Sequence, residues 1–298
     1  MTTILEKFGI NPVQIVVPKG LDYVGSVSIR SEHAIGIEVE VENVVDVARI
    51  PKGSVWTSKT DGSLRNAGME FITMPIPASY APAVLNQLMT QVLNQHCSFS
   101  PRTSVHVHLN VQDLELHQAL DYVLLYSIFE KLFYKFAGRG RIRNIFCVPI
   151  TETDLLVNLI AKGVSKPWSK YTGLNLCPLS TRGDGAGFGT IEFRHMHGTF
   201  DVEKLSVWIN FITMLKEYVM KTDTKVIRKM LIDMDDNFDF GRLLFDIFGD
   251  YAGNFKFGDN EEIKSCYMAT RMALLNETIR SKVVNTAKTS AAFYNFKG

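Results

Sequence analysis

Residues Ile35–Val41 alternate strictly between apolar and acidic side chains, and no other stretch constrains the fold as strongly. Successive side chains of a β-strand point to opposite faces, so this pattern predicts a strand with one apolar face and one face carrying Glu38, Glu40 and Glu42. Glutamate is a poor strand former, and same-face neighbours lie only about 7 Å apart. This row of like charge suggests bound divalent cations, with the solvated outer face of an edge strand as the alternative.

The composition is that of an ordinary globular protein of 298 residues, 46% hydrophobic and 21% charged. A chain of this length can bury one large core, or form one main domain with a smaller appendage. The net charge of +1 argues against broad electrostatic attraction to nucleic acid or to anionic membranes. We therefore expect neither of them as a partner.

Four cysteines are widely scattered, with no CxxC pair, which favours reduced thiols in a cytosolic protein. The first residues lack a basic region followed by an apolar one, and no uncharged apolar run approaches the roughly 18 residues that span a bilayer. We expect a cytoplasmic protein that is neither exported nor inserted into a membrane.

Two further predicted strands carry polar side chains on one face. Residues Met69–Met74 place Glu70 among apolar residues, and Ser104–Asn110 place His106 and His108 opposite an apolar face. Imidazole binds metals and phosphate-bearing ligands, although two histidines at this spacing are also found incidentally on protein surfaces.

A glycine-rich segment, Arg182–Gly189, precedes the predicted strand Thr190–His197. The glycines do not match a P-loop or a dinucleotide fingerprint, so the segment is either a mobile hairpin loop over a site or a flexible surface loop. In the strand, Glu192 and Arg194 share one face. His195 and His197 fall with the apolar residues, and we assign both of them structural roles.

Helical spacing of apolar residues predicts helices from about Ser79, over 112–137, from Thr151 to before Gly163, and from an Asp201 cap to about Lys221. The remainder is expected to be mainly helical, with a turn-rich break at 250–260. We therefore expect an N-terminal arm over 1–30, a catalytic domain over 31–222 and a helical C-terminal region over 223–298.

Together, these strands predict an α+β fold in which a curved antiparallel sheet lines its concave face with cation ligands and packs helices on its convex face. Carboxylates with an imidazole suit two or more Mg²⁺ or Mn²⁺ ions. The arginines around Gly140 either offset the dipole at a helix C-terminus or clamp phosphates. Phosphoryl chemistry on a nucleotide is the implication.

Six short motifs occur in the order found in the putative amidoligase family, which is related to glutamate-cysteine ligases and glutamine synthetases. They are Gly36-Ile-Glu-Val-Glu40, Asp61-Gly-Ser63, Gly68-Met-Glu-Phe71, Ser104-Val-His-Val-His108, Tyr171 through Asn175 and Ile191-Glu-Phe-Arg194. Over about residues 30 to 220 the chain resembles that family. The resemblance implies a glutamine synthetase-like catalytic sheet and ATP-dependent joining of a carboxylate to an amine through an acyl phosphate.

The resemblance also implies roles for individual residues. The implied metal ligands are Glu38, Glu40, Glu70, His106 and Glu192. His108 looks like a neighbour of the nucleotide or substrate, Arg194 like the arginine that steadies the transferred phosphoryl group, and Asp61 and Ser63 like residues on the acceptor-substrate side. The candidates for contacts with ATP phosphates are Arg139, Arg141, Arg143 and Lys170.

Two other functions fit the same residues: a phosphotransferase of the guanidino kinase type, and a non-catalytic binding or structural protein that retains the sheet. Four retained carboxylates argue against the last, because an unused acidic cleft is repulsive. The sequence leaves open the identity of the carboxylate, which is a small molecule, a peptide or a protein side chain. It also leaves open the amine and the oligomeric state.

Overall fold

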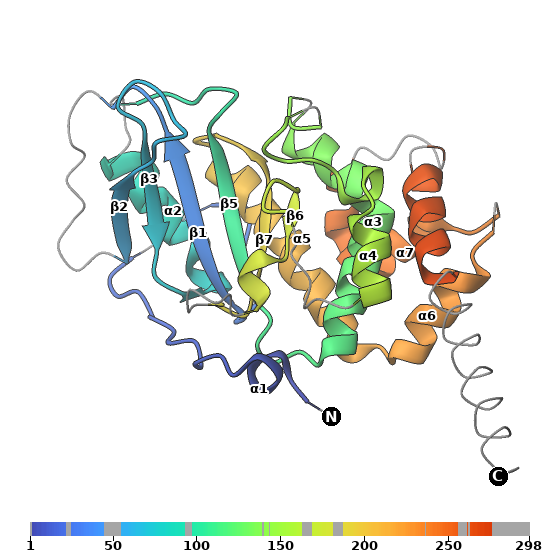
Figure 1. Ribbon diagram of the computed structural model, residues 1–298. Coiled ribbons are helices and arrows are strands. Elements are labelled where there is room, and N and C mark those ends of the chain that lie inside the picture. Colours follow the sequence, from blue (N-terminus) through green and yellow to red (C-terminus); the bar gives the residue numbers. More distant parts are fainter. Residues whose placement is uncertain are drawn as a thin grey trace, which may run out of the picture.

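The computed structural model describes residues 2–21, 25–44, 55–92, 97–138, 140–142, 144–162, 169–180, 187–235, 237–255, 261 and 263–275. Within them the chain forms an open, seven-stranded antiparallel sheet with helices packed on it, which confirms the predicted α+β class (Figure 1). No helix of this described part is long and apolar enough to cross a membrane. No disulfide joins the four cysteines.

The strands lie in the order β2-β3-β1-β5-β7-β6, with β4 paired to the beginning of β1. Every pair is antiparallel, and β1 is hydrogen-bonded to β3 on one side and to β5 on the other. The strand bounds are β1 Ala34–Val41, β2 Trp56–Thr60, β3 Met69–Thr73, β4 Ile76–Pro77, β5 Ser104–Asn110, β6 Leu174–Asn175 and β7 Thr190–His197.

One face of the sheet is apolar and lies against helices. The apolar residues of β1 and β5, such as Ile37, Val39 and Val107, are almost completely buried. Helices α2 and α5 lie behind the sheet, with α3 beside α5 (Figure 1). The helices are α1 Ile4–Phe8, α2 Ala81–Gln87, α3 Leu116–Ala137, α4 Leu155–Lys162, α5 Val202–Lys221, α6 Thr224–Asp233 and α7 Phe240–Phe248, with shorter turns η1 Ala78–Tyr80, η2 Leu88–Val92, η3 Ile150–Glu152, η4 Cys177–Leu179 and η5 Gly249–Asn254.

Two predicted helix starts differ from the structure. The helix expected over 112–137 begins at Leu116, where Glu115 and Gln118 form a capping box. The helix expected from Thr151 begins at Leu155, because Thr151 lies in the single turn η3, where its backbone N–H and hydroxyl both donate to the buried carboxylate of Glu130. Asp201 caps α5 as expected, accepting from the backbone N–H of Lys204 at 2.9 Å.

The C-terminal region is helical where it is described. Helices α6 and α7 precede η5, and residues 263–275 form a further helical stretch. Phe248 of α7 and Phe255 pack against Phe211 of α5, so this region shares the core of the sheet domain. Residues 256–260 of the predicted break lie outside the described residues. The boundary at residue 222 stays a prediction.

A β-bulge interrupts the pairing of β5 with β7. Val107 lies opposite Phe193 but Val105 lies opposite Met196, so β7 has one more residue than β5 in this interval. Arg194 lies on the polar face with Glu192, as regular alternation requires, and the bulge allows both His195 and Met196 to be completely buried. The His195 ring lies 4.7 Å from the Tyr134 ring, and its Nε2 lies 2.5 Å from the Tyr126 hydroxyl, so its role is structural, as expected.

We predict a pH dependence of stability from His195. Burial, followed by the charges of Arg141 and His106, lowers its pKa well below the ordinary value. As the pH falls below about 6.5, the unfolded state takes up a proton that the folded state does not, so the native state loses stability. Between pH 7.5 and 5.5, the protein should lose about 1.4 kcal/mol more than His195→Phe, measured by urea unfolding at each pH.

The phenyl ring is a suitable replacement because the Tyr126 hydroxyl retains its hydrogen bond to Glu130 at 2.8 Å. Parallel stability curves for the two proteins over this pH range would contradict the assignment.

One side chain, Gln112, ties three distant segments together at the end of β5. Its amide donates to the carbonyls of Asn11 and Phe188 at 3.1 and 2.9 Å and accepts from the backbone N–H of Val13 at 2.9 Å. The N-terminal arm is thereby fixed against the end of the glycine-rich segment.

Gly189 makes this arrangement possible, and we predict that Gly189→Ala is more destabilising than a comparable change elsewhere. Its φ is +66°, and an added Cβ would lie 2.5 Å from Gln112 Cγ. The left-handed backbone costs about 1 kcal/mol for alanine, and each disturbed hydrogen bond of Gln112 costs about 1 kcal/mol more. Urea unfolding should show a loss of about 2–4 kcal/mol.

Gly20→Ala is the matched control, because Gly20 has a φ of +65° with no atom within 4 Å of the added Cβ. Its cost should be about 1 kcal/mol, the backbone contribution alone. Equal losses in the two variants would show that the clash with Gln112 is relieved without cost.

Candidate metal centre

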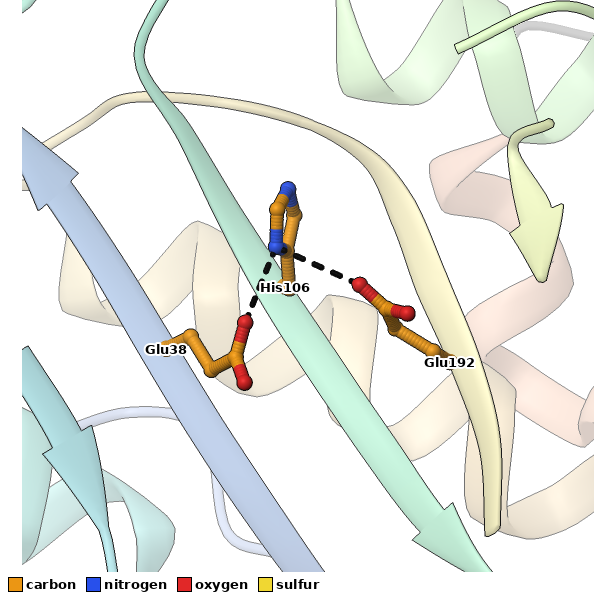
Figure 2. A group of neighbouring side chains, drawn as sticks. All are labelled: Glu38, His106 and Glu192. Atoms are coloured by element: carbon orange, nitrogen blue, oxygen red, sulfur yellow. Dashed lines mark hydrogen bonds and ion pairs between the residues drawn. The ribbon is translucent and has the colours of Figure 1, made fainter. Parts of the chain in front are cut away.

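Three adjacent strands bring Glu38, His106 and Glu192 together on the polar face of the sheet (Figure 2). The antiparallel register places Glu38 of β1 directly opposite His106 of β5, and Glu192 of β7 opposite His108 of β5. His106 and Glu192 are almost completely buried, and the Glu38 side chain is 20% exposed. The sequence predicted all three as metal ligands, and the fold supplies the register that joins them.

The spacing of these side chains fits one divalent cation. His106 Nδ1 lies 3.1 Å from Glu38 Oε2 and 3.4 Å from Glu192 Oε1, and one ligand atom from each of the three lies within 4.8 Å of the others. Two ligands at about 2.1 Å from an ion and at right angles lie about 3 Å apart. Two carboxylates and one imidazole suit Mn²⁺, Mg²⁺ or Zn²⁺. The group could therefore hold a metal ion.

A hydrogen-bonded chain orients His106 from behind. Ser104 Oγ lies 2.7 Å from His106 Nε2 and donates to Glu40 Oε2 at 2.5 Å. Because the Ser104 proton goes to Glu40, His106 Nε2–H donates to Ser104, and Nδ1 faces the two carboxylates. Glu40 was predicted as a ligand, but in the structure it lies outside the three-residue group and fixes the imidazole through Ser104.

Glu192 is held by neighbours on both sides. Its Oε2 accepts from Asn175 Nδ2 at 2.5 Å, and its Oε1 accepts from Arg194 Nη1. Burial raises the pKa of Glu192, but His108, His106 and Arg194 outweigh burial and hold the pKa below its ordinary value. Glu192 is therefore a carboxylate at neutral pH.

Glu38 contacts both imidazoles of β5. In addition to the His106 contact, Glu38 Oε1 lies 3.2 Å from His108 Nε2, while His108 Nδ1 lies 3.1 Å from Thr190 Oγ1. Burial opposes ionisation of Glu38, but the two histidines outweigh it and lower its pKa. The pKa of His108 is raised, because Glu38 and Glu192 outweigh the effect of burial. The positive charge that Glu38 attracts can come from protons or from a metal ion.

A second acidic pair lies beside this centre. Glu70 of β3 is opposite Glu40 of β1 and forms an ion pair with Lys59 of β2, with Nζ 2.9 Å from Oε2. Burial, followed by the charge of Glu38, raises the pKa of Glu70 to about 7, although Lys59 opposes the shift. Glu70 was predicted as a ligand, and in the structure it is buried next to the group and paired with a lysine.

The other predicted site residues lie elsewhere or outside the described residues. Asp61 Oδ1 accepts from the backbone N–H of Ser63 at 2.7 Å, which stabilises the turn after β2. Arg141 is buried and donates to the β7 carbonyls of Arg194 and His195, and Lys170 is exposed. Outside the described residues are Arg139, Arg143 and residues 181–186 of the glycine-rich segment.

The structure adds polar residues to which the sequence assigned no role in the site: Lys59, Ser104, Asn175 and Thr190. Each contacts a predicted residue across neighbouring strands, as in the Lys59–Glu70 and Asn175–Glu192 register pairs. The alternation in Ser104–Asn110 did place Ser104 on the polar face. The pairing itself depends on strand order, which alternation does not give.

Comparison with known proteins gives no family assignment: no protein-family model matches the chain, and no curated protein matches it in sequence. What the site can do is therefore argued from its own chemistry.

We predict that the three-residue group binds Mn²⁺ and that Glu38→Gln and Glu192→Gln each weaken binding strongly, because each removes a charged ligand. Ser104→Ala should weaken it about 10-fold, since a side chain that orients a metal ligand typically contributes 10- to 100-fold to affinity. Isothermal titration calorimetry measures the Mn²⁺ affinity of each of these three variants. Glu152→Gln, a change at an exposed glutamate, should leave the affinity unchanged. Unaltered binding in both Glu38→Gln and Glu192→Gln would exclude this centre.

Proposed function

We propose that this protein is an ATP-dependent carboxylate-amine ligase that forms an amide bond through an acyl phosphate. The proposal extends to a glutamine synthetase-like catalytic fold, with ATP and Mg²⁺ or Mn²⁺ at the polar face of the sheet. The observation that carries it is the Glu38–His106–Glu192 group with Arg194 beside it. Cation ligands next to a partly buried guanidinium are the groups that phosphoryl transfer requires.

The reaction has two steps in which atoms and charges balance. A carboxylate oxygen of the substrate attacks the γ-phosphorus of ATP, the bond to the bridging oxygen of the β-phosphate breaks, and ADP leaves. The amine nitrogen then attacks the acyl carbon, the bond to the phosphate oxygen breaks, phosphate leaves, and the nitrogen loses a proton. A divalent ion bound by the three-residue group would neutralise phosphate oxygens.

Arg194 has a donor available for this chemistry. Its Nη1 donates to Glu192, whereas its Nε is buried and has no hydrogen-bond partner among the described residues. A buried N–H without a partner is costly, and a phosphoryl oxygen would satisfy it with a charge-assisted hydrogen bond. Glu192 in turn fixes the guanidinium, and Asn175 fixes Glu192. These residues orient charge before the substrate arrives.

We predict that a panel of carboxylic acids, incubated with ATP, Mg²⁺ and hydroxylamine, yields a hydroxamate together with ADP and phosphate. Hydroxylamine intercepts an acyl phosphate as the amine would. Glu38→Gln and Glu192→Gln should lower the rate about 100-fold or more, because each removes charge that holds the cation. Glu152→Gln serves as the control and should retain the full rate.

The products distinguish the alternatives. A stable phosphorylated guanidine or alcohol, with no hydroxamate from any carboxylate, would identify a phosphotransferase. AMP and pyrophosphate would contradict both kinds of enzyme. Absence of any rise in melting temperature with millimolar ATP and either metal would exclude an intact nucleotide site, since a ligand at a hundredfold excess over its Kd stabilises by about 2.7 kcal/mol.

A further inference from the structure

A pocket of about 590 Å³ adjoins the metal centre. Its floor includes Gly36 and Glu38 of β1 and His108 of β5, and the N-terminal arm, which runs beside this end of the sheet in Figure 1, forms one wall. The size is ample for a small organic molecule. Because Glu38 belongs both to the pocket and to the metal centre, a ligand in the pocket has one end at the cation ligands.

The pocket is mainly apolar. Its walls include the hydrophobic side chains Ile10, Pro12, Val13, Ile72, Met74 and Phe188. Among the described residues that line it, only Glu38 and His108 have ionisable side chains, and both are at the end next to the metal centre. A charged group deep in the pocket would lose its hydration and meet no opposite charge from these residues.

Several polar side chains in the wall already have hydrogen-bond partners. Both amide hydrogens of Gln112 are donated to backbone carbonyls, and its oxygen accepts from Val13. Asn110 Oδ1 accepts from the backbone N–H of Gln112 at 2.9 Å, and the Thr190 hydroxyl contacts His108. These hydrogen bonds hold the wall together and occupy the amide of Gln112, which would otherwise be available to a polar ligand.

Gly36 opens this space. It lies opposite His108 in the sheet, and a Cβ added to it would meet only His108 Cβ, at an ordinary 3.7 Å. No side chain from β1 therefore fills the floor at this position. A larger residue here could enter the pocket without moving the backbone, because Gly36 has no left-handed φ.

We infer that this pocket binds the uncharged, apolar body of the carboxylate substrate, whose carboxylate group lies at the metal centre. The inference rests on the proposed function and names its substrate class: acids with an aliphatic or aromatic body, as opposed to acids with a second charged group. Apolar walls supply affinity through burial, and the cation ligands fix the orientation.

The test is calorimetric titration of the Mn²⁺-loaded protein with butanoate, hexanoate and octanoate, and with glutarate and glutamate. Burial of each added methylene should tighten binding about fourfold along the straight-chain series. The dicarboxylates should bind more weakly than hexanoate. A parallel series of butanol, hexanol and octanol, with and without Mn²⁺, should show the same increment, because it reports on the pocket whether or not the metal centre is functional.

Gly36→Leu should abolish the increment per methylene in both series while retaining the native circular dichroism spectrum. Gly253→Leu is the matched control, since Gly253 is exposed in η5 and has no atom within 4 Å of an added Cβ. It should retain the full increment.

Three results would overturn the inference. The first is an affinity that does not rise with chain length, and the second is tighter binding of glutarate or glutamate than of hexanoate. The third is competition of adenosine with octanoate, which would assign the pocket to the nucleobase. Failure of the proposed function gives a different result. A chain-length increment without any hydroxamate would retain the pocket and remove the ligase, whereas hydroxamate formation with a flat series would remove the pocket alone.

Discussion

The two carboxylates that flank His106 are the constraint on which the rest of the polar face depends. Glu38 and Glu192 are both ionised, and they approach one imidazole nitrogen from two different strands. Like charges this close are unfavourable unless positive charge lies between or beside them. The protein supplies part of it from Arg194, whose Nη1 donates to Glu192, and a cation bound by Glu38, His106 and Glu192 would supply the rest. The hydrogen bonds between Ser104 and His106 and between Asn175 and Glu192 orient these side chains without neutralising the carboxylates.

The bulge in β7 lets one strand carry charged side chains on the polar face and also bury two consecutive side chains in the core. A strand of regular alternation would keep His195 and His197 on one face, but the extra residue lets both His195 and Met196 enter the core while Arg194 stays beside Glu192. Arg141 then holds the bulged backbone by donating to the carbonyls of Arg194 and His195. A residue that the sequence suggested as a phosphate ligand is thus used to stabilise an irregular strand. It positions Arg194 through its backbone.

The sequence predicted the strands of the polar face closely, because strict alternation is a local property that survives without knowledge of the fold. It predicted helix starts less well: Leu114 continues the helical spacing of apolar residues, but Gln112 lies before the helix and holds the N-terminal arm. It did not indicate that Glu40 would contact Ser104, or that Lys59 would reach Glu70. Both contacts follow from strand order and register, which are set by long-range packing and not by neighbours in the chain.

Hydrogen bonds between distant segments also place an apolar pocket beside the charged group of the candidate metal centre. Gln112 brings the arm and Phe188 to the beginning of β1, so apolar residues from distant parts of the chain lie next to a charged cluster. Apolar walls exclude water and lower the local dielectric, which strengthens the attraction of Arg194, and of a cation held by Glu38, His106 and Glu192, for a negative charge beside them. In the proposed reaction, such walls would also shield an acyl phosphate from water. The hydrogen bonds of Gln112 to Asn11, Val13 and Phe188 favour this exclusion of water, because they occupy amide groups that would otherwise bind it.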